Sequence, residues 1–249
     1  MAISILTLEV SISANAGLFE QMGGKNWKEE VLLHDGRKII VERVQNLGRR
    51  PTLESLEGRI LDDTISFSIP ETRQQVTWTM SFRDDLPEPN GINVVVLDIV
   101  DSVPYVGGYP AGCIAYNKWK RPNPPQILFK HEDGRWKRVL LAEFPPQISR
   151  ANVIVGGPPA EGIQAFYTAG QVNERNHGID TPEYKTILRE PVKRGAVGSS
   201  VNCVEMVPYG KGGWLGLDWF SDQPSYEACL KFCEAKGVSP ENCPCATLF

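Results

Sequence analysis

Hydrophobic and polar positions alternate along much of this chain, and a period of two is typical of half-buried β-strands. Ile92–Val100 is almost continuously apolar, which predicts a central strand. Asp35-Gly36 and Asp133-Gly134 suit tight turns, so each predicts a hairpin. The pattern predicts strands at residues 27–33, 37–44, 64–69, 75–82, 92–100, 113–119, 126–131 and 135–141.

Short strands with regular turn signals predict a mainly β fold. The arrangement is expected to be an antiparallel sandwich, barrel-like, or an irregular meander of short strands. The alternation weakens after Pro158, where residues 161–169 are predicted to form a short helix. The sequence divides into an N-terminal segment (1–17), a β-rich globular domain (18–218) and a cysteine-rich helical tail (219–249).

The N-terminal segment has two interpretations. An apolar run from Ile3 to Ile12 is followed by Ala14-Asn-Ala16, the small-x-small form of a signal-peptide cleavage site. A basic n-region is missing, however, and Glu9 interrupts the apolar run. Residues 1–17 are therefore interpreted as a degenerate signal-like segment, and alternatively as an ordinary buried first strand.

Four of the six cysteines are close together in the tail. Residues 221–224 resemble a helix start, and Gly237 is a good stop residue. Cys229 and Cys233 then lie on one helical face, with Cβ atoms roughly 6 Å apart. Cys243 and Cys245 share a face of an extended return segment, roughly 6.5–7 Å apart. The natural pairing is antiparallel, joining Cys233 to Cys243 and Cys229 to Cys245.

The cysteines have alternative uses. The four tail cysteines could instead surround one zinc ion or stay as free buried thiols, and zinc is the only cofactor the sequence suggests. Cys113 and Cys203 are expected in strands, as a third bridge or as small buried residues. The disulfide interpretation favours a periplasmic or secreted protein, with a cytoplasmic location as the alternative.

Composition narrows the classes of partner. The net charge of −4 argues against a nucleic-acid or anionic-membrane binder. No apolar run is long enough to predict a transmembrane segment. A length of 249 residues with 41% hydrophobic residues is typical of a globular chain with one full core.

Three blocks of the chain carry a family resemblance. Residues 27–43, 116–125 and 182–191 resemble an uncharacterised family of proteobacterial proteins. Members of that family commonly look exported, with a signal or lipoprotein-type leader, and this chain departs from them in its degenerate leader. The resemblance implies no activity and no catalytic residues.

Motifs for catalysis are weak, and no catalytic residue is assigned. His34 and His131 fall at predicted hairpin turns, where polar residues are expected anyway. The best polar-loop candidates are Glu174, His177 and Asp180, which lie close together in sequence. The segment Tyr209–Trp214 lacks the frame of a phosphate-binding loop, so a flexible turn is its better interpretation.

One segment joins positive charge to an aromatic ring and a stiff proline run. Trp119 could stack on a glycan or anionic partner, with charge supplied by Lys118, Lys120 and Arg121. The alternative is that Trp119 packs on the sheet, with Trp136 as its cross-strand companion.

Two hypotheses for function follow. The first is a non-enzymatic exported or envelope-associated β-rich domain with a binding or structural role, whose partner would be an envelope component or a glycan. The second is an enzyme of unrecognised type with a polar loop site near His177. A concave site that gathers His177, Glu174 and a second titratable group would favour the enzyme.

Overall fold

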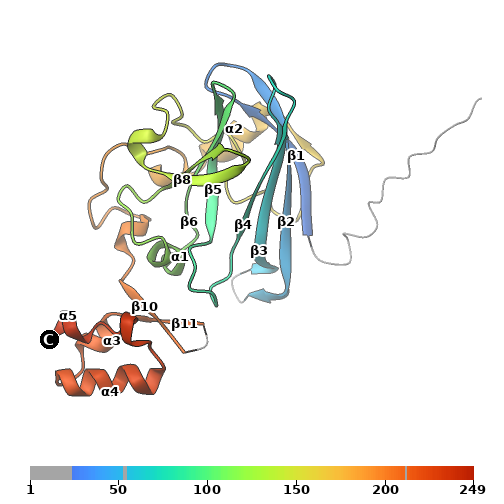
Figure 1. Ribbon diagram of the computed structural model, residues 1–249. Helices are drawn as coiled ribbons and strands as arrows, with labels where there is room; N and C mark the ends of the chain where they lie inside the picture. The colour runs from blue at the N-terminus through green and yellow to red at the C-terminus, as the bar shows by residue number, and fades with distance from the viewer. Residues whose placement is uncertain (1–23, 53–54, 211) are drawn as a thin grey trace, which may run out of the picture.

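The protein is a β-sandwich with a small disulfide-rich module below it (Figure 1). The structure is a computed structural model that describes residues 24–52, 55–210 and 212–249. The predicted segment 1–17 lies outside the described residues. The mainly β class, the antiparallel sheets and the cysteine-linked C-terminal helix are confirmed.

The first sheet has the strand order β4-β3-β2-β1-β9, and its neighbours are antiparallel except for the parallel pair β1 and β9. The second sheet has the order β5-β6-β7-β8 and is antiparallel throughout. The strands of the sandwich are β1 (Gly24–Leu32), β2 (Lys38–Thr52), β3 (Ser55–Ser68), β4 (Gln75–Ser81), β5 (Ile92–Val100), β6 (Val103–Pro110), β7 (Ile127–Glu132), β8 (Arg135–Val139) and β9 (Phe166–Tyr167).

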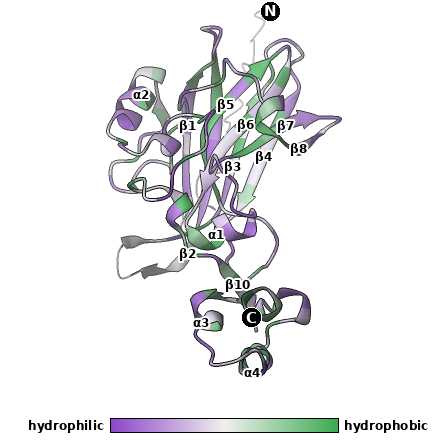
Figure 2. Ribbon diagram, turned by 90° about the vertical axis from the view of Figure 1, so that its left-hand side faces the viewer, coloured by the Kyte–Doolittle hydropathy of each residue, from purple (hydrophilic) through white to green (hydrophobic). Residues whose placement is uncertain are grey.

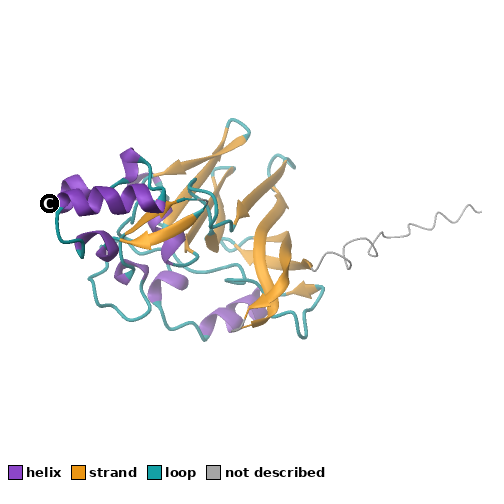
Figure 3. Cartoon of the chain, turned by 90° about the horizontal axis from the view of Figure 1, so that it is seen from below, coloured by secondary structure: helices purple, strands orange, loops and turns teal. Residues whose placement is uncertain are grey.

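Helices connect the strands or cover their edges. The helix α2 (Ala169–His177) packs beside β1, and α1 (Cys113–Lys118) follows β6. The module holds the hairpin β10 (Met206–Tyr209) and β11 (Gly213–Gly216), with α3 (Asp218–Ser221), α4 (Tyr226–Lys236) and α5 (Cys245–Leu248). Figure 3 shows the helices of the module gathered at the C-terminal end. Short 3-10 turns are at Leu141–Glu143, Pro182–Tyr184, Ser200–Asn202 and Pro240–Asn242.

The main core lies between the two sheets. Buried and exposed positions alternate along β1 and β4, which places one set of side chains between the sheets; Figure 2 shows the hydrophobic and hydrophilic residues along the strands. Trp78 of β4 and Trp119 from the end of α1 both meet the ring of Phe129 on β7 edge-on. Three smaller clusters lie on the outer face of the second sheet, under α2 and inside the module.

One end of the sandwich interior is charged instead of apolar. The Arg43 guanidinium is fully buried between the carboxylates of Glu29 and Asp63. It also donates to the carbonyl oxygen of Ile154 at 2.7 Å, while the Ile154 N–H donates to Glu29 at 2.9 Å. These bonds attach the loop after β8 to the first sheet. Because an unpaired buried charge would be costly, the three charged groups are expected to stay paired.

Most predicted strands form, and several other expectations are wrong. Residues 113–119 fold as α1 and not as a strand, so Cys113 and Cys203 are not in strands. Residues 161–169 contain the short strand β9, and the helix lies later, at Ala169–His177. Trp136 pairs across the hairpin with His131, so it is not the companion of Trp119.

The predicted disulfide pairing is confirmed. Cys229 is bonded to Cys245 and Cys233 to Cys243, while Cys113 and Cys203 form the third bridge. The return segment, however, is a 3-10 turn followed by α5 and not an extended chain. The helix begins after the cap Ser225, later than expected, and ends at Gly237 in the left-handed conformation as predicted. Paired sulfurs offer no thiolate, so zinc could bind the tail only after reduction.

Candidate functional site

The clearest candidate site is a cleft between the sandwich and the cysteine module, which we call the interlobe cleft. It has a volume of about 300 Å³, at the lower limit of small-molecule sites. The sandwich contributes the loop between β4 and β5, and the module contributes its hairpin and the turn after α4. The residues that carry its chemistry are Asp84, Asp85, Tyr209, Trp214, Ser239 and Glu241.

The glycine-rich hairpin tip fixes one wall of this cleft. Gly212 has a φ of +89°, and a Cβ there would lie 2.8 Å from the Cα of Asp85. The backbones therefore approach so closely that only glycine fits. The Trp214 indole nitrogen donates to the carbonyl oxygen of Asp84 at 3.1 Å. Gly212 and Trp214 thus dock this end of the hairpin on the loop between β4 and β5, so it is not the free turn that the sequence predicts.

The carboxylates of the cleft differ in their pairing. Asp84 accepts from Arg59 at 2.7 Å, and Asp85 from Arg83 at 2.6 Å. The hydrogen bond from Arg83 lowers the pKa of Asp85, and that from the Ser239 hydroxyl lowers the pKa of Glu241. Glu241 forms no ion pair within the described residues. The cleft therefore offers hydrogen-bond acceptors, of which Asp84 and Asp85 are compensated by arginines and Glu241 is not.

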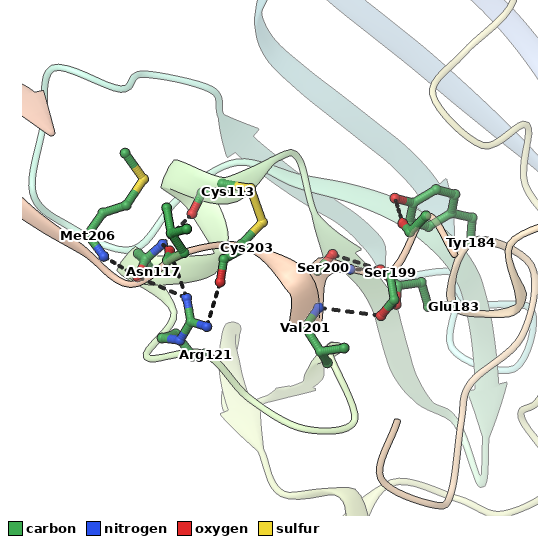
Figure 4. The surroundings of a disulfide bond; sticks show 12 residues. Cys113, Asn117, Arg121, Glu183, Tyr184, Ser199, Ser200, Val201, Cys203 and Met206 are labelled. Atoms are coloured by element: carbon green, nitrogen blue, oxygen red, sulfur yellow. Dashed lines mark hydrogen bonds between the residues drawn. A yellow bond between two sulfur atoms is a disulfide. The ribbon is translucent and has the colours of Figure 1, made fainter. Parts of the chain in front are cut away.

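A covalent and hydrogen-bonded joint holds the module in place (Figure 4). The Cys113–Cys203 disulfide links α1 to the segment that leads into β10. Arg121 donates to the carbonyl oxygen of Cys203 at 2.7 Å and to that of Val204 at 2.9 Å. Asn117 receives the N–H of Met206 at 2.9 Å. The two walls of the cleft are thereby fixed relative to each other.

A buried carboxylate anchors the same segment further upstream. Glu183 is 1% exposed and accepts from the hydroxyl of Ser199 at 2.5 Å and from the N–H of Ser200 at 2.9 Å. The Ser200 hydroxyl adds a bond of 2.7 Å. These three hydrogen bonds satisfy the buried carboxylate, so this anchor supports the joint from the sandwich side.

The residues predicted to bind a partner through Trp119 mostly make contacts within the protein itself. Trp119 is 7% exposed and donates to the carbonyl oxygen of Asn90 at 2.9 Å. Lys118 is 3% exposed and donates to the carbonyl oxygen of Arg83, and Arg121 belongs to the joint. Lys120 alone is exposed, so these four residues do not form an open stacking surface. Lys118 contacts a wall of the interlobe cleft, with its ammonium 5.9 Å from the Trp214 ring.

The predicted polar-loop residues do not bond to one another in the structure. Glu174 and His177 lie on α2, and Asp180 follows the helix. All three are exposed, and within the described ranges none forms a hydrogen bond or an ion pair with another. No concave arrangement with a second titratable group joins them in the cleft described above.

Sequence reasoning missed the interlobe cleft. Its residues are far apart in the chain, and only the folded joint brings Asp84 to Trp214. The signal that could have indicated it is the glycine cluster before Trp214, because glycines mark close backbone approach.

Comparisons with protein-family models, with curated proteins and with solved structures returned no match. The family resemblance of residues 27–43, 116–125 and 182–191 therefore stays a prediction. Among the described residues, no helix has both the length and the apolar character needed to cross a bilayer.

Proposed function

We propose that this protein is an exported or envelope-associated binding protein whose interlobe cleft takes a neutral saccharide. The observation that carries the proposal is the combination of Trp214 and Tyr209 with carboxylates in one preformed cleft. A sugar ring presents C–H groups that pack on an aromatic face. Its hydroxyls donate to carboxylates, and both kinds of group line the same cleft.

The charges favour a neutral ligand over an ionic one. Phosphates and other anions would meet three carboxylates, so they are disfavoured. A polycation would find two of those carboxylates already paired with arginines. Hydroxyl donors remain the best match, because they can share an ion-paired carboxylate without displacing its partner.

The disulfides support the exported location. All six cysteines are paired, and disulfides persist mainly in oxidising compartments. A glycan partner of the cell envelope is consistent with such a compartment. The alternative of an enzyme centred on His177 has no supporting contact among the described residues.

The test is an array of immobilised oligosaccharides, covering glucans, chitin fragments and peptidoglycan glycan strands, probed with residues 18–249. We expect selective retention on one structural class, followed by saturable heat release in titration calorimetry. Retention on no neutral saccharide, or on charged ones alone, would contradict the proposal.

A further inference from the structure

A second cavity, of about 390 Å³, lies beside the β1–β2 turn, between that turn, β5 and α2. Its floor contains a histidine oriented by a buried carboxylate. The ring Nδ1 of His34 is 2.8 Å from Oδ1 of Asp98, and the His34 backbone N–H donates to Oδ2 at 2.9 Å. The side chain of Asp98 is 4% exposed and that of His34 is 22% exposed.

This geometry sets the chemistry of the ring. The carboxylate is an acceptor, so in the neutral imidazole Nδ1 carries the hydrogen and Nε2 keeps a lone pair. Nε2 has no partner among the described residues. A histidine held in this way is the arrangement required of a general base.

Several other polar side chains around the cavity have no hydrogen-bond or ion-pair partner among the described residues. The side chains of Gln147, Ser149, Arg150 and Asn173 line it and form no hydrogen bond or ion pair within residues 24–52, 55–210 and 212–249. Asn152 differs, since its amide bonds to both carbonyl and N–H groups of the backbone and is a structural contact. The open guanidinium of Arg150 gives the cavity a cationic group.

From this juxtaposition we infer that the cavity is a hydrolytic site for small carboxylic esters that bear an anionic group, with His34 as general base. Nε2 takes a proton from a water molecule as its oxygen attacks the ester carbonyl. The tetrahedral intermediate then expels the alcohol, which takes the proton back from Nε2, leaving an acid and an alcohol. Arg150 binds the anionic group of the substrate. This cavity shares no lining residue with the interlobe cleft.

The chain has three histidines, so the test needs few variants. The probe is 4-nitrophenyl hemisuccinate, with 4-nitrophenyl acetate as its uncharged comparator. We expect hydrolysis of the probe above the buffer rate. The protein-dependent rate should fall at least about 100-fold in His34→Ala. His131→Ala and His177→Ala are the matched controls and should keep the wild-type rate. Arg150→Gln should remove the preference for the hemisuccinate.

Folding is controlled with a second variant. His34→Asn places an amide N–H near Asp98 and can keep that bond, but it offers no base. It should retain the wild-type melting temperature and lose the rate as His34→Ala does. A His34→Asn protein that hydrolyses at the wild-type rate, or a wild-type protein no faster than buffer, would overturn the inference.

Discussion

The indole Nε1–H of Trp214 donates a 3.1 Å hydrogen bond to the backbone carbonyl of Asp84, which lies 130 positions earlier in the chain. This bond joins the cysteine module to the sandwich at the wall of the interlobe cleft. The hydrogen bond holds the Trp214 side chain in one orientation before any ligand binds. Binding therefore costs this side chain little further rotamer freedom. A ligand that stacks on Trp214 meets a preorganised surface, which reduces the entropic cost of association.

The Cys113–Cys203 disulfide of the joint should stabilise the folded protein measurably. Replacing Cys113 and Cys203 together with serine removes a bridge that spans 90 residues. We expect a loss of about 2–4 kcal/mol in the free energy of unfolding. Urea denaturation followed by circular dichroism measures it. An unchanged midpoint would show that Arg121 and Glu183 hold the module without the bridge.

Close backbone approach at the hairpin tip gives a second prediction. Gly212→Ala places a Cβ against the backbone of Asp85, whereas Gly112, also at positive φ, has open space around its Cβ position. Gly112, at φ +102° and ψ 178°, is in an extended positive-φ conformation, so Gly112→Ala should cost about 1–3 kcal/mol from the backbone alone. Gly212→Ala should cost more and should also change Trp214 fluorescence. Equal losses in denaturation experiments would contradict the docked hairpin.

The buried charge cluster of the sandwich is predicted to be intolerant of partial removal. Arg43→Met leaves Glu29 and Asp63 buried without their cation. We expect a loss of about 3–5 kcal/mol or failure to fold. Lys28→Met is the control on the outer face, because its pair with Glu42 is solvent-exposed. That change should cost at most about 1 kcal/mol in the same urea denaturation.

Stability should fall in alkali because of one tyrosine. Burial raises the pKa of Tyr109 from its ordinary value of 10.0 to about 12. Its ring is stacked on Tyr184 with centroids 4.0 Å apart. The stabilising contribution of the neutral phenol is complete below pH 10 and is lost as the pH rises through about 12.

Tyr109→Phe tests this assignment. The variant should show a shallower fall in melting temperature between pH 10 and 12 than the wild type. A spectrophotometric titration at the phenolate band should also lose its most basic tyrosine. Identical pH dependence in both proteins would assign the effect to another group.

The sequence predicts the elements whose signals are local. The nearly continuous apolar run identifies β5 at its observed limits, Ile92–Val100, and helical spacing places Cys229 and Cys233 correctly. The pairing with Cys243 and Cys245 is right even though the return segment is helical, because chain reversal at Gly237 already makes the order antiparallel.

Other features depend on contacts between distant segments. The strand β6 was not predicted, because Gly107 and Gly108 interrupt the hydrophobic pattern. At Gly108 the neighbouring strand comes so close that a Cβ would lie 2.2 Å from the carbonyl oxygen of Asn93. The pair of His34 and Asp98 spans 64 positions and joins a turn to a buried strand. No pattern along the chain indicates such a pair.

The central claim is that Trp214 in the interlobe cleft contacts the ligand. The most direct measurement compares Trp214→Phe with Trp219→Phe on the oligosaccharide array, after both variants are shown to melt as the wild type does. Trp219 is in the same module and is 54% exposed, outside the residues that line the cleft. We predict that retention on the array falls at least tenfold for Trp214→Phe and is unchanged for Trp219→Phe. Unchanged retention for Trp214→Phe, or an equal loss for Trp219→Phe, would contradict the assignment of the cleft.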